Sequence, residues 1–173
     1  MNVALELIKV IVPASVVLYA VYLIVRSFIQ REIELKKLDV RGRSIETILP
    51  TRLQAYERMT LFLERISPQN LLMRLTNPVF SAKDFQKVLL DEIRNEYNHN
   101  ASQQVYMSEE VWNQIRNAKE DLIILINEAS SRMMPDAKSI DLSKKIFEMA
   151  MEKKVDLIAL AMTELKKEIQ QIF

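Results

Sequence analysis

Hydrophobic positions divide the chain into one long apolar run near the N-terminus and a series of amphipathic segments after it. Residues 10–25, with the sequence VIVPASVVLYAVYLIV, include no charged side chain. Extended from Ile8 to Phe28, this run forms a helix of about 21 residues and about 31 Å at 1.5 Å per residue. That length matches a bilayer hydrocarbon core of about 30 Å. The pattern therefore predicts one transmembrane helix.

The predicted span has two notable features. Pro13 lies in its first turns, where a missing N–H is tolerated best. Tyr19 and Tyr22 lie deeper than an interfacial aromatic belt, which indicates a face that contacts another helix. Residues expected in the membrane include Ile8, Val10, Pro13, Tyr19, Tyr22, Val25 and Phe28. Two other interpretations stay open: a buried core helix of a soluble protein, and a cleaved signal peptide, whose apolar region usually has only about 7–15 residues.

The charges on the two sides of the run predict its orientation. Before it, the positive groups are Lys9 and the amino terminus. Six basic residues follow it: Arg26, Arg31, Lys36, Lys37, Arg41 and Arg43. Because basic flanks stay on the cytoplasmic side of a membrane, we expect the N-terminus outside and the C-terminal domain in the cytoplasm.

The single glycine marks the predicted boundary between anchor and domain. The stretch from Arg26 to Leu38 consists of helix-forming residues without a break and continues the membrane helix as a stalk. Gly42 then lies within Val40 to Ser44, where a glycine indicates a hinge. The sequence predicts an anchor and stalk over residues 1–42 and a domain over residues 43–173.

Capping signals divide this domain into helices. Pro50 suits the first position of a helix that runs to about Ile66 with apolar residues at a/d spacing. Residues 95–104, rich in Asn and Gln, are predicted as a loop, and the last helix is expected to reach Phe173. The other predicted starts are Ser67-Pro68 before a short helix over 69–75, Ser81 with Asp84, Ser108, and Ser139 or Asp141. The expected fold is all-α: an N-terminal transmembrane helix plus a cytoplasmic helical bundle of about four helices.

Composition excludes several classes of fold and function. One glycine and five prolines in 173 residues are too few turn residues for a multi-strand β fold. A net charge of +1 does not fit a dedicated nucleic-acid-binding protein, which carries a basic excess. The chain has no cysteine and a single histidine, which excludes thiolate sites and most zinc sites. We therefore expect no nucleic-acid partner, no cofactor and no metal.

One internal repeat places charged residues on a shared helix face. Tyr56-Glu57-Arg58 returns seven residues later as Leu63-Glu64-Arg65, and residues seven apart lie on nearly the same face of a helix. The candidate residues are Arg52, Glu57, Arg58, Glu64 and Arg65. They form either a surface that docks a partner or ion pairs within the bundle, and we favour the ion pairs. A di-metal carboxylate bundle needs Glu-x-x-His motifs, and neither repeated glutamate begins one.

The chain lacks the common catalytic signatures. It contains no Gly-rich phosphate loop and no His-Glu-x-x-His, Gly-x-Ser-x-Gly or EF-hand pattern. His99 lies between two asparagines and is expected in solvent, whereas Trp112 is expected as a core anchor. The sequence therefore predicts a protein that is not an enzyme.

One segment resembles a known group of proteins. The run is Leu49-Pro50-x-Arg52-Leu53-Gln54-Ala55-Tyr56-Glu57-Arg58, continued by Leu61-Phe62-Leu63-Glu64-Arg65-Ile66-Ser67-Pro68. It resembles a family of uncharacterised bacterial membrane-anchored helical proteins, in which a similar segment follows one N-terminal hydrophobic helix. The resemblance implies a single-pass protein of the bacterial inner membrane. It implies no activity, so no catalytic residue is carried over.

Two classes of function fit these observations. We favour a non-catalytic adaptor or accessory subunit, held in the lipid bilayer, that contacts a protein partner or another copy of itself at the cytoplasmic face. The alternative is an enzyme or small-ligand-binding bundle that uses interior Glu and Arg side chains. The surroundings of Glu57, Arg58, Glu64 and Arg65 discriminate between the two, because a catalytic set would line a cavity and have perturbed pKa values.

Overall fold

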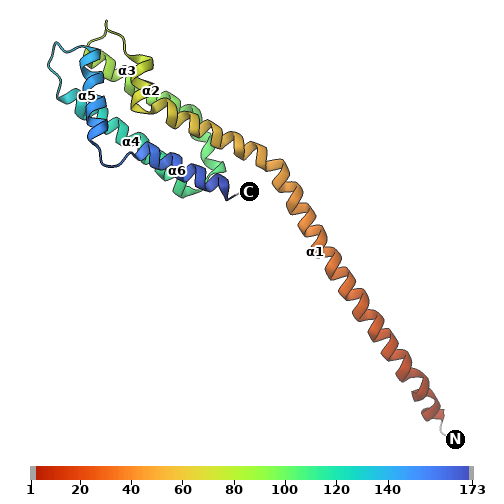
Figure 1. The fold of residues 1–173 in the computed structure, drawn as a ribbon. Coiled ribbons are helices and arrows are strands. Elements are labelled where there is room, and N and C mark those ends of the chain that lie inside the picture. The colour runs from red at the N-terminus through yellow and green to blue at the C-terminus, as the bar shows by residue number, and fades with distance from the viewer. Residues whose placement is uncertain (1–2, 172–173) are drawn as a thin grey trace. The chain divides into compact units, whose positions relative to one another are not determined.

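The computed structural model is helical throughout the residues it describes. These are the backbone of residues 3–171 and the side chains of Ile8, residues 11–37 and residues 47–171. The elements are α1 (Val3–Ile66), α2 (Pro68–Leu75), α3 (Ala82–Asn100), the 3-10 helix η1 (Ala101–Tyr106), α4 (Glu109–Ser131), α5 (Ser139–Glu152) and α6 (Leu157–Gln170) (Figure 1). An isolated bridge between Ser81 and Lys138 is the one extended pairing within residues 3–171. The all-α prediction is confirmed.

The chain forms two compact units, Met1–Leu49 and Pro50–Phe173. Helix α1 contributes to both units. It continues through Gly42, so the hinge that we expected at this glycine does not interrupt the helix. One glycine costs a helix only about 1 kcal/mol relative to alanine, and the helix-forming residues around it offset that cost. The division into an anchor over residues 1–42 and a domain over residues 43–173 stays a prediction.

Pro50 lies inside α1, so the prediction that it begins a helix is wrong. A proline in a helix interior removes one hydrogen bond to the carbonyl four residues earlier. Its fixed φ is nevertheless helical, and the residues before it form helix as well. The same proline coincides with the division between the two units.

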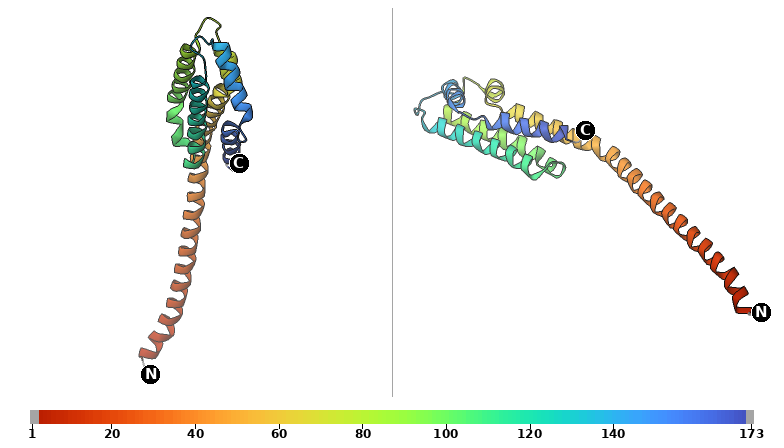
Figure 2. Two further views of the ribbon diagram at one scale, coloured as in Figure 1. Left: turned by 90° about the vertical axis from the view of Figure 1, so that its left-hand side faces the viewer. Right: turned by 60° about the horizontal axis from the view of Figure 1, so that its bottom comes forward.

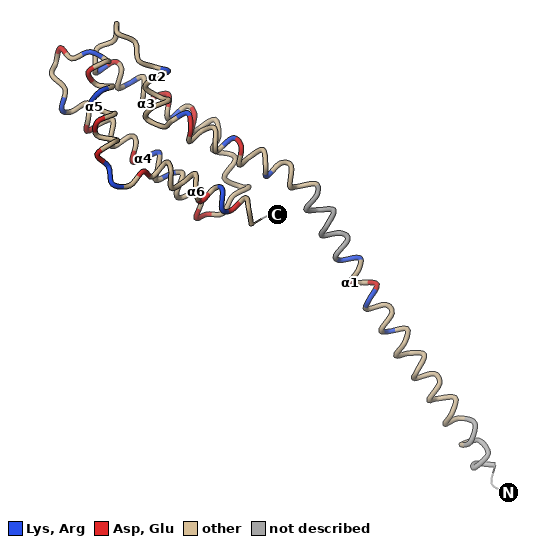
Figure 3. Tube along the Cα trace, in the orientation of Figure 1, with Lys and Arg blue, Asp and Glu red and all other residues tan. Residues whose placement is uncertain are grey.

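One helical segment among the described residues is long and apolar enough to cross a membrane, Ile11–Lys37, with a mean hydropathy of 1.9. Every described side chain in it is exposed, and no Lys, Arg, Asp or Glu marks residues 11–25 in Figure 3. Of the residues predicted in the membrane, six have described side chains, all exposed on α1: Ile8, Pro13, Tyr19, Tyr22, Val25 and Phe28. Val10 lies in the same helix, but its side chain is outside the described set.

The second unit is a helical bundle around one core. Helix α4 packs against α3, α5 and α6, and α5 also packs against α2 and α3; α3, α4 and α5 lie side by side in both Figures 1 and 2. The broad apolar face predicted for the end of α1 is confirmed, because its Tyr56, Met59, Phe62, Leu63 and Ile66 are buried. They join core residues of the other helices that include Phe85, Leu89, Ile93, Ile115, Ile126, Leu142, Ile146 and Leu165.

Two of the predicted helix caps form with their side chains as expected. The Ser81 hydroxyl accepts a hydrogen bond from the Asp84 N–H at 3.1 Å, and the Ser108 hydroxyl accepts one from the Val111 N–H at 3.3 Å. Ser67 precedes α2 with Pro68 at its start, but its hydroxyl donates backwards to the Glu64 carbonyl at 2.8 Å. The side-chain caps of Ser81 and Ser108 therefore mark the starts of α3 and α4.

The connection after α3 differs from the prediction of a loop over residues 95–104. Helix α3 runs to Asn100 and is followed directly by η1. The Asn100 amide donates to the Glu96 carbonyl at 2.8 Å, so an asparagine side chain satisfies a carbonyl near the helix end. An Asn- and Gln-rich composition therefore did not stop the helix.

The predicted single helix from residue 139 or 141 to Phe173 is wrong, because two helices occupy this stretch. They are α5 and α6, separated by residues 153–156. The Asp156 carboxylate accepts from the Ile158 and Ala159 N–H groups at 2.9 and 3.1 Å and caps α6. At the start of α5 the cap residue is Lys138, whose N–H donates to the Asp141 carboxylate at 3.0 Å. The bundle consequently has more helices than the four expected.

Candidate functional site

The five predicted site residues do not come together in one place. Glu57 and Arg58 are exposed on α1. Glu64 is also exposed, and its carboxylate accepts from the Asn70 amide at 3.4 Å. Arg52 and Arg65 each form an ion pair with another helix, but their partners are not Glu57 or Glu64.

Arg65 belongs to a surface network that joins α1, α2 and α3. Its guanidinium lies 2.6 Å from the Glu96 carboxylate and 3.9 Å from that of Glu92. Glu92 also pairs with Arg74 of α2. Because these groups are partly exposed, water and salt screen the attraction, and each pair stabilises the fold by about 1 kcal/mol or less. The network holds surface positions in register and offers no enclosed site.

Arg52 belongs to a more buried network centred on Glu168, which we call the Glu168 clasp: Arg52, Tyr56, Tyr106, Ser108 and Glu168. The Tyr56 hydroxyl donates to Glu168 Oε1 at 2.5 Å, and Arg52 Nη2 donates to the Tyr56 hydroxyl at 3.0 Å. Arg52 Nε also donates to the Tyr106 carbonyl at 3.2 Å. These contacts connect α1, η1 and α6.

The same carboxylate holds the start of α4. The Ser108 N–H donates to Glu168 Oε1 at 2.9 Å, and the Ser108 hydroxyl donates to Oε2. Ser108 is the N-cap residue of α4, so Glu168 supplies a negative charge where the helix dipole is positive. A single side chain of α6 thereby ties together three segments that are distant in sequence.

Burial and hydrogen bonding set the protonation states of the clasp. Burial and the hydrogen bond to Glu168 raise the pKa of Tyr56 to about 12, so its hydroxyl stays protonated and donates. Burial by itself raises the pKa of Glu168, but hydrogen bonds from Ser108 and Tyr56 and the charge of Arg52 outweigh it and lower that pKa. The carboxylate is therefore ionised and surrounded by donors, which suits a structural role better than that of a general base.

The aromatic cluster beside α1 includes the predicted core anchor Trp112. The ring of Tyr97 lies 5.9 Å from Phe62 and 5.6 Å from Trp112, measured between centroids. The Lys119 ammonium lies 4.1 Å from the centroid of Tyr97, within the range of a cation–π contact. Trp112 is half-buried and packs against the core, whereas His99 is exposed at the end of α3.

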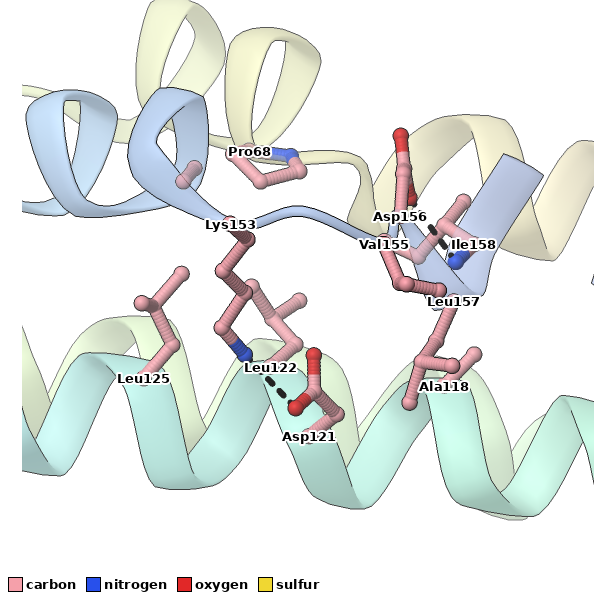
Figure 4. Close-up of a pocket in the computed structure, with 11 residues that line it drawn as sticks. Pro68, Ala118, Asp121, Leu122, Leu125, Lys153, Val155, Asp156, Leu157 and Ile158 are labelled. Atoms are coloured by element: carbon pink, nitrogen blue, oxygen red, sulfur yellow. Dashed lines mark hydrogen bonds and ion pairs between the residues drawn. The ribbon is translucent and has the colours of Figure 1, made fainter. Parts of the chain in front are cut away.

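A small cavity lies between α4 and the connection from α5 to α6 (Figure 4). Its volume is about 60 Å³, and Leu122, Leu125 and Leu157 are among its apolar lining residues. Lys153 reaches across to Asp121 at 2.6 Å. Ligand pockets usually have about 300–1,000 Å³, so this cavity does not accommodate an organic cofactor.

An apolar groove of the bundle lies between α2 and α5. We call it the α2–α5 groove: Gln69, Leu72, Met73, Thr76, Ser143, Lys144 and Phe147, with a volume of about 520 Å³. Its wall is closed by a 2.9 Å hydrogen bond between the Thr76 and Ser143 hydroxyls. Met73 is 78% exposed, so the groove presents apolar side chains to solvent.

The other surface hollows described for the bundle are lined mainly by polar or charged side chains, and one of them lies beside Arg52 and Glu168. Among residues with described side chains, no three His, Cys, Asp or Glu lie close enough to hold a metal ion. A second surface hollow between α3 and α4 is lined mainly by polar groups, and these bond to one another: Gln86 donates to Asn127 at 2.8 Å and accepts from Ser130 at 2.9 Å. Glu57, Arg58, Glu64 and Arg65 line none of the pockets described above.

Sequence reasoning missed Glu168 but not all of its partners. Ser108 was expected as a helix cap, and Tyr56 as a core position. Glu168 contacts Tyr56 across 112 residues of chain, and no local pattern marks a pairing of that separation. The one available signal was the polar hydroxyl of Tyr56 on an otherwise apolar face, because a buried tyrosine hydroxyl needs a partner.

Comparisons with known proteins place the chain in a family without assigning an activity. Residues 2–172 match a family described as "Family of unknown function (DUF7935)". The match is wider than the segment up to Pro68 that carried the resemblance noted from the sequence. The searches of curated proteins and of solved structures found no match. Because the match covers nearly the whole length, the chain belongs to the DUF7935 family.

Proposed function

We propose that this protein is a non-catalytic adaptor or accessory subunit. In this proposal residues 11–37 of α1 hold it in the lipid bilayer, and the bundle over residues 50–171 binds a protein partner in the cytoplasm. The observation that carries the proposal is the exposure of every described side chain in Ile11–Lys37, the most apolar helical segment described.

The exposure of this segment supports a bilayer over a protein core as its surroundings. A helix of a soluble core would be mostly buried, whereas none of the tested window is buried within the chain. Each fully buried Val, Leu or Ile side chain contributes about 1.5–3 kcal/mol relative to exposure in water. An apolar surface that is left open all around the helix is therefore strongly favoured to enter lipid.

The basic residues after the apolar segment support a cytoplasmic location of the bundle. Arg26, Arg31, Lys36 and Lys37 follow the uncharged residues, and all four are exposed. Lys36 pairs with Glu32 at 3.6 Å, and among the described side chains no ion pair engages Arg26, Arg31 or Lys37. Positive flanks are retained on the cytoplasmic side during insertion.

Binding rather than catalysis is supported by the way the bundle uses its charged groups. The residues that would serve a catalytic role lie on the surface or, as in the Glu168 clasp, already have several hydrogen-bond partners. The cavity beside Lys153 is small. An adaptor needs neither a pocket nor a reactive group, only an accessible surface.

The α2–α5 groove is the surface we assign to partner binding. Met73 and Phe147 give it apolar contacts, and Lys144 gives it a positive charge. The complementary occupant is an amphipathic helix of another protein that places apolar side chains in the groove and a carboxylate opposite Lys144.

Affinity purification of the full chain from detergent-solubilised membranes tests the proposal. We expect a specific protein to co-purify with the wild type and with Val105→Glu, a change at an exposed position on η1 outside the groove. The same protein should be lost with Phe147→Glu, which puts a charge in the groove. A purified protein that stays in the soluble fraction, or a partner that Phe147→Glu retains, contradicts the proposal.

A further inference from the structure

We propose that α1 pairs with α1 of a second copy of this chain through a stripe of hydroxyl side chains. The stripe consists of Ser15, Tyr19 and Tyr22 and is called the hydroxyl stripe. The inference rests on the proposed function, because it requires the uncharged residues 11–25 to lie in lipid. It adds a defined partner and a defined face to that proposal.

The stripe gathers all the polar side chains of the uncharged span. Between Ile11 and Val25, the residues other than Ser15, Tyr19 and Tyr22 are Val, Ile, Leu, Ala or Pro. Spacings of four and three residues place the three hydroxyls on one face of a helix. The Tyr19 and Tyr22 rings lie together, with centroids 6.4 Å apart and an interplanar angle of 27°.

Hydroxyls in lipid need hydrogen-bond partners. The Ser15 hydroxyl donates to the Ile11 carbonyl at 2.8 Å within its own helix. Tyr19 and Tyr22, 64% and 56% exposed, form a ring contact with each other, but their hydroxyls have no such bond among the described residues. Burying a hydroxyl in an apolar medium without a hydrogen-bond partner is unfavourable.

Tyr19 lies too deep in the predicted span for its hydroxyl to reach a hydrogen-bond partner at the membrane surface. It is nine residues before Phe28, which is about 14 Å along the helix axis at 1.5 Å per residue. A tyrosine side chain is too short to cross that distance. A second helix packed against the stripe supplies the missing groups, because polar side chains hydrogen-bond between helices within membranes.

The chemistry of the stripe fits a second copy of this chain. A hydroxyl both donates and accepts, so two stripes are complementary to each other in a twofold arrangement, where the same patch serves both subunits. The stripe carries no charge within the span, so it does not require a partner of opposite charge. Val12 lies three residues before Ser15, and Ile29 lies seven residues after Tyr22 with Arg26 between them on the same face. Alternating spacings of three and four residues are those of helices that cross at about 20°.

Disulfide cross-linking in native membranes tests the inference directly, because the full chain has no cysteine. Single cysteines are introduced at Val12, Ser15 or Tyr22 on the stripe side, and at Val17, Val21 or Ile24 on the other side of the helix. After mild oxidation we expect covalent dimers for the first set and monomers for the second. Because both sets of cysteine positions lie in the same helix, each set is a control for the other.

The contribution of the hydroxyls is tested in the Ser15→Cys background. Replacing both tyrosines, Tyr19→Phe and Tyr22→Phe, keeps the rings and removes the hydroxyls. Because hydrogen bonds between membrane helices are individually modest, we expect about fivefold less dimer. Ile24→Val, on the opposite face, should leave the amount of dimer unchanged.

The outcomes separate this inference from the proposed function. Each variant is first checked for retention in carbonate-washed membranes, and loss of the wild type from that fraction overturns both proposals. Retention with no dimer, or with equal dimer on all faces, overturns the pairing of two copies and leaves the anchor intact. Cross-links from the stripe to a different membrane protein also overturn it and identify that protein as the partner.

Discussion

Helix α1 has two regions with the same backbone and opposite surroundings. Over residues 11–37 all described side chains are exposed, although the sequence there is strongly apolar. Over residues 55–66 apolar side chains such as Met59 and Phe62 are buried, while Glu57 and Glu64 face outward. The spacing of apolar residues, more than helix propensity, therefore indicates the surroundings of a helix. A single apolar stripe fits a water-soluble bundle, and an apolar surface all around the helix fits lipid.

The two regions also differ in how they satisfy tyrosine hydroxyls. Tyr56 donates to Glu168 and accepts from Arg52 inside the bundle. The rings of Tyr19 and Tyr22 contact each other, but their hydroxyls have no hydrogen-bond partner among the described residues. A bundle provides partners from its own chain, whereas a lone helix must obtain them from another molecule.

Removing the N-terminal region of α1 from the bundle should have the largest effect, which is on membrane association. A fragment of residues 43–173 should leave the membrane fraction entirely and remain a soluble, helical protein with a cooperative melt, because the buried core lies within it. Fractionation and circular dichroism check this expectation. A fragment that aggregates or melts without cooperativity would show that the first unit is needed for folding.

Truncating the core side of α1 should cost about 2–5 kcal/mol of unfolding free energy. The variant is Leu63→Ala, at a side chain that is 0% exposed. Its matched control is Leu61→Ala on the same helix, 54% exposed, which should change stability by about 0.5 kcal/mol or less. Urea denaturation of the 43–173 fragment measures both, and equal midpoints would mean that α1 is peripheral to the bundle.

Removing the charge at the centre of the Glu168 clasp should have an intermediate effect. Hydrogen bonds to a charged group contribute about 1.5–3 kcal/mol, and Glu168→Gln loses the charge that Ser108, Tyr56 and Arg52 surround. Glu164→Gln on the same helix is the control, since the ion pair of Glu164 is with Lys167, three residues later. Urea denaturation at pH 7 should separate the two variants clearly.

The same clasp predicts a pH dependence. The pKa of Glu168 is lower in the folded protein than its ordinary value of 4.5, so its contribution is fully present above that value and is lost as the pH falls through the folded pKa. Glu168→Gln should therefore flatten the acid limb of the stability curve below about pH 4.5. An unchanged acid limb would assign the acid sensitivity to other carboxylates.

The smallest effect is expected from the repeated glutamates of α1. Both Glu57 and Glu64 are exposed, so replacing them together by Gln should shift the unfolding free energy by about 0.5 kcal/mol or less. Had they formed internal ion pairs, as we favoured from the sequence, the loss would be about 3–5 kcal/mol. A large loss of stability in the 43–173 fragment would restore that interpretation.

Local signals in the sequence were sufficient for much of the fold. The caps at Ser81 and Ser108 and the broad apolar face ending at Ile66 depend on residues a few positions apart. Gly42 and Pro50 misled the prediction, because a single unfavourable residue does not end a helix whose neighbours favour it. The start of α6 was missed although Asp156 is a good cap residue, since no Gly or Pro accompanies it.

The Glu168 clasp shows what sequence patterns do not contain. Its members come from four segments, and the bond from Tyr56 to Glu168 joins α1 and α6 across 112 residues of chain. The repeated Glu and Arg positions drew attention because they recur at a helical spacing. Among the candidate residues, Arg65 pairs with α3 and Arg52 with α6. Glu57, Arg58 and Glu64 are exposed on α1, so a docking role for the repeat stays a prediction.

A fusion of green fluorescent protein after Phe173 tests the central claim most directly when its fluorescence is measured in carbonate-washed membranes. This protein fluoresces when it folds in the bacterial cytoplasm. The account predicts a bright fusion that stays in the washed membranes, because α1 crosses the bilayer within residues 11–37 and the C-terminal domain lies inside. Fluorescence in the supernatant would contradict the anchor. The orientation would be contradicted by a fusion that stays in the membrane but is dark, if an alkaline phosphatase fusion at the same position is active.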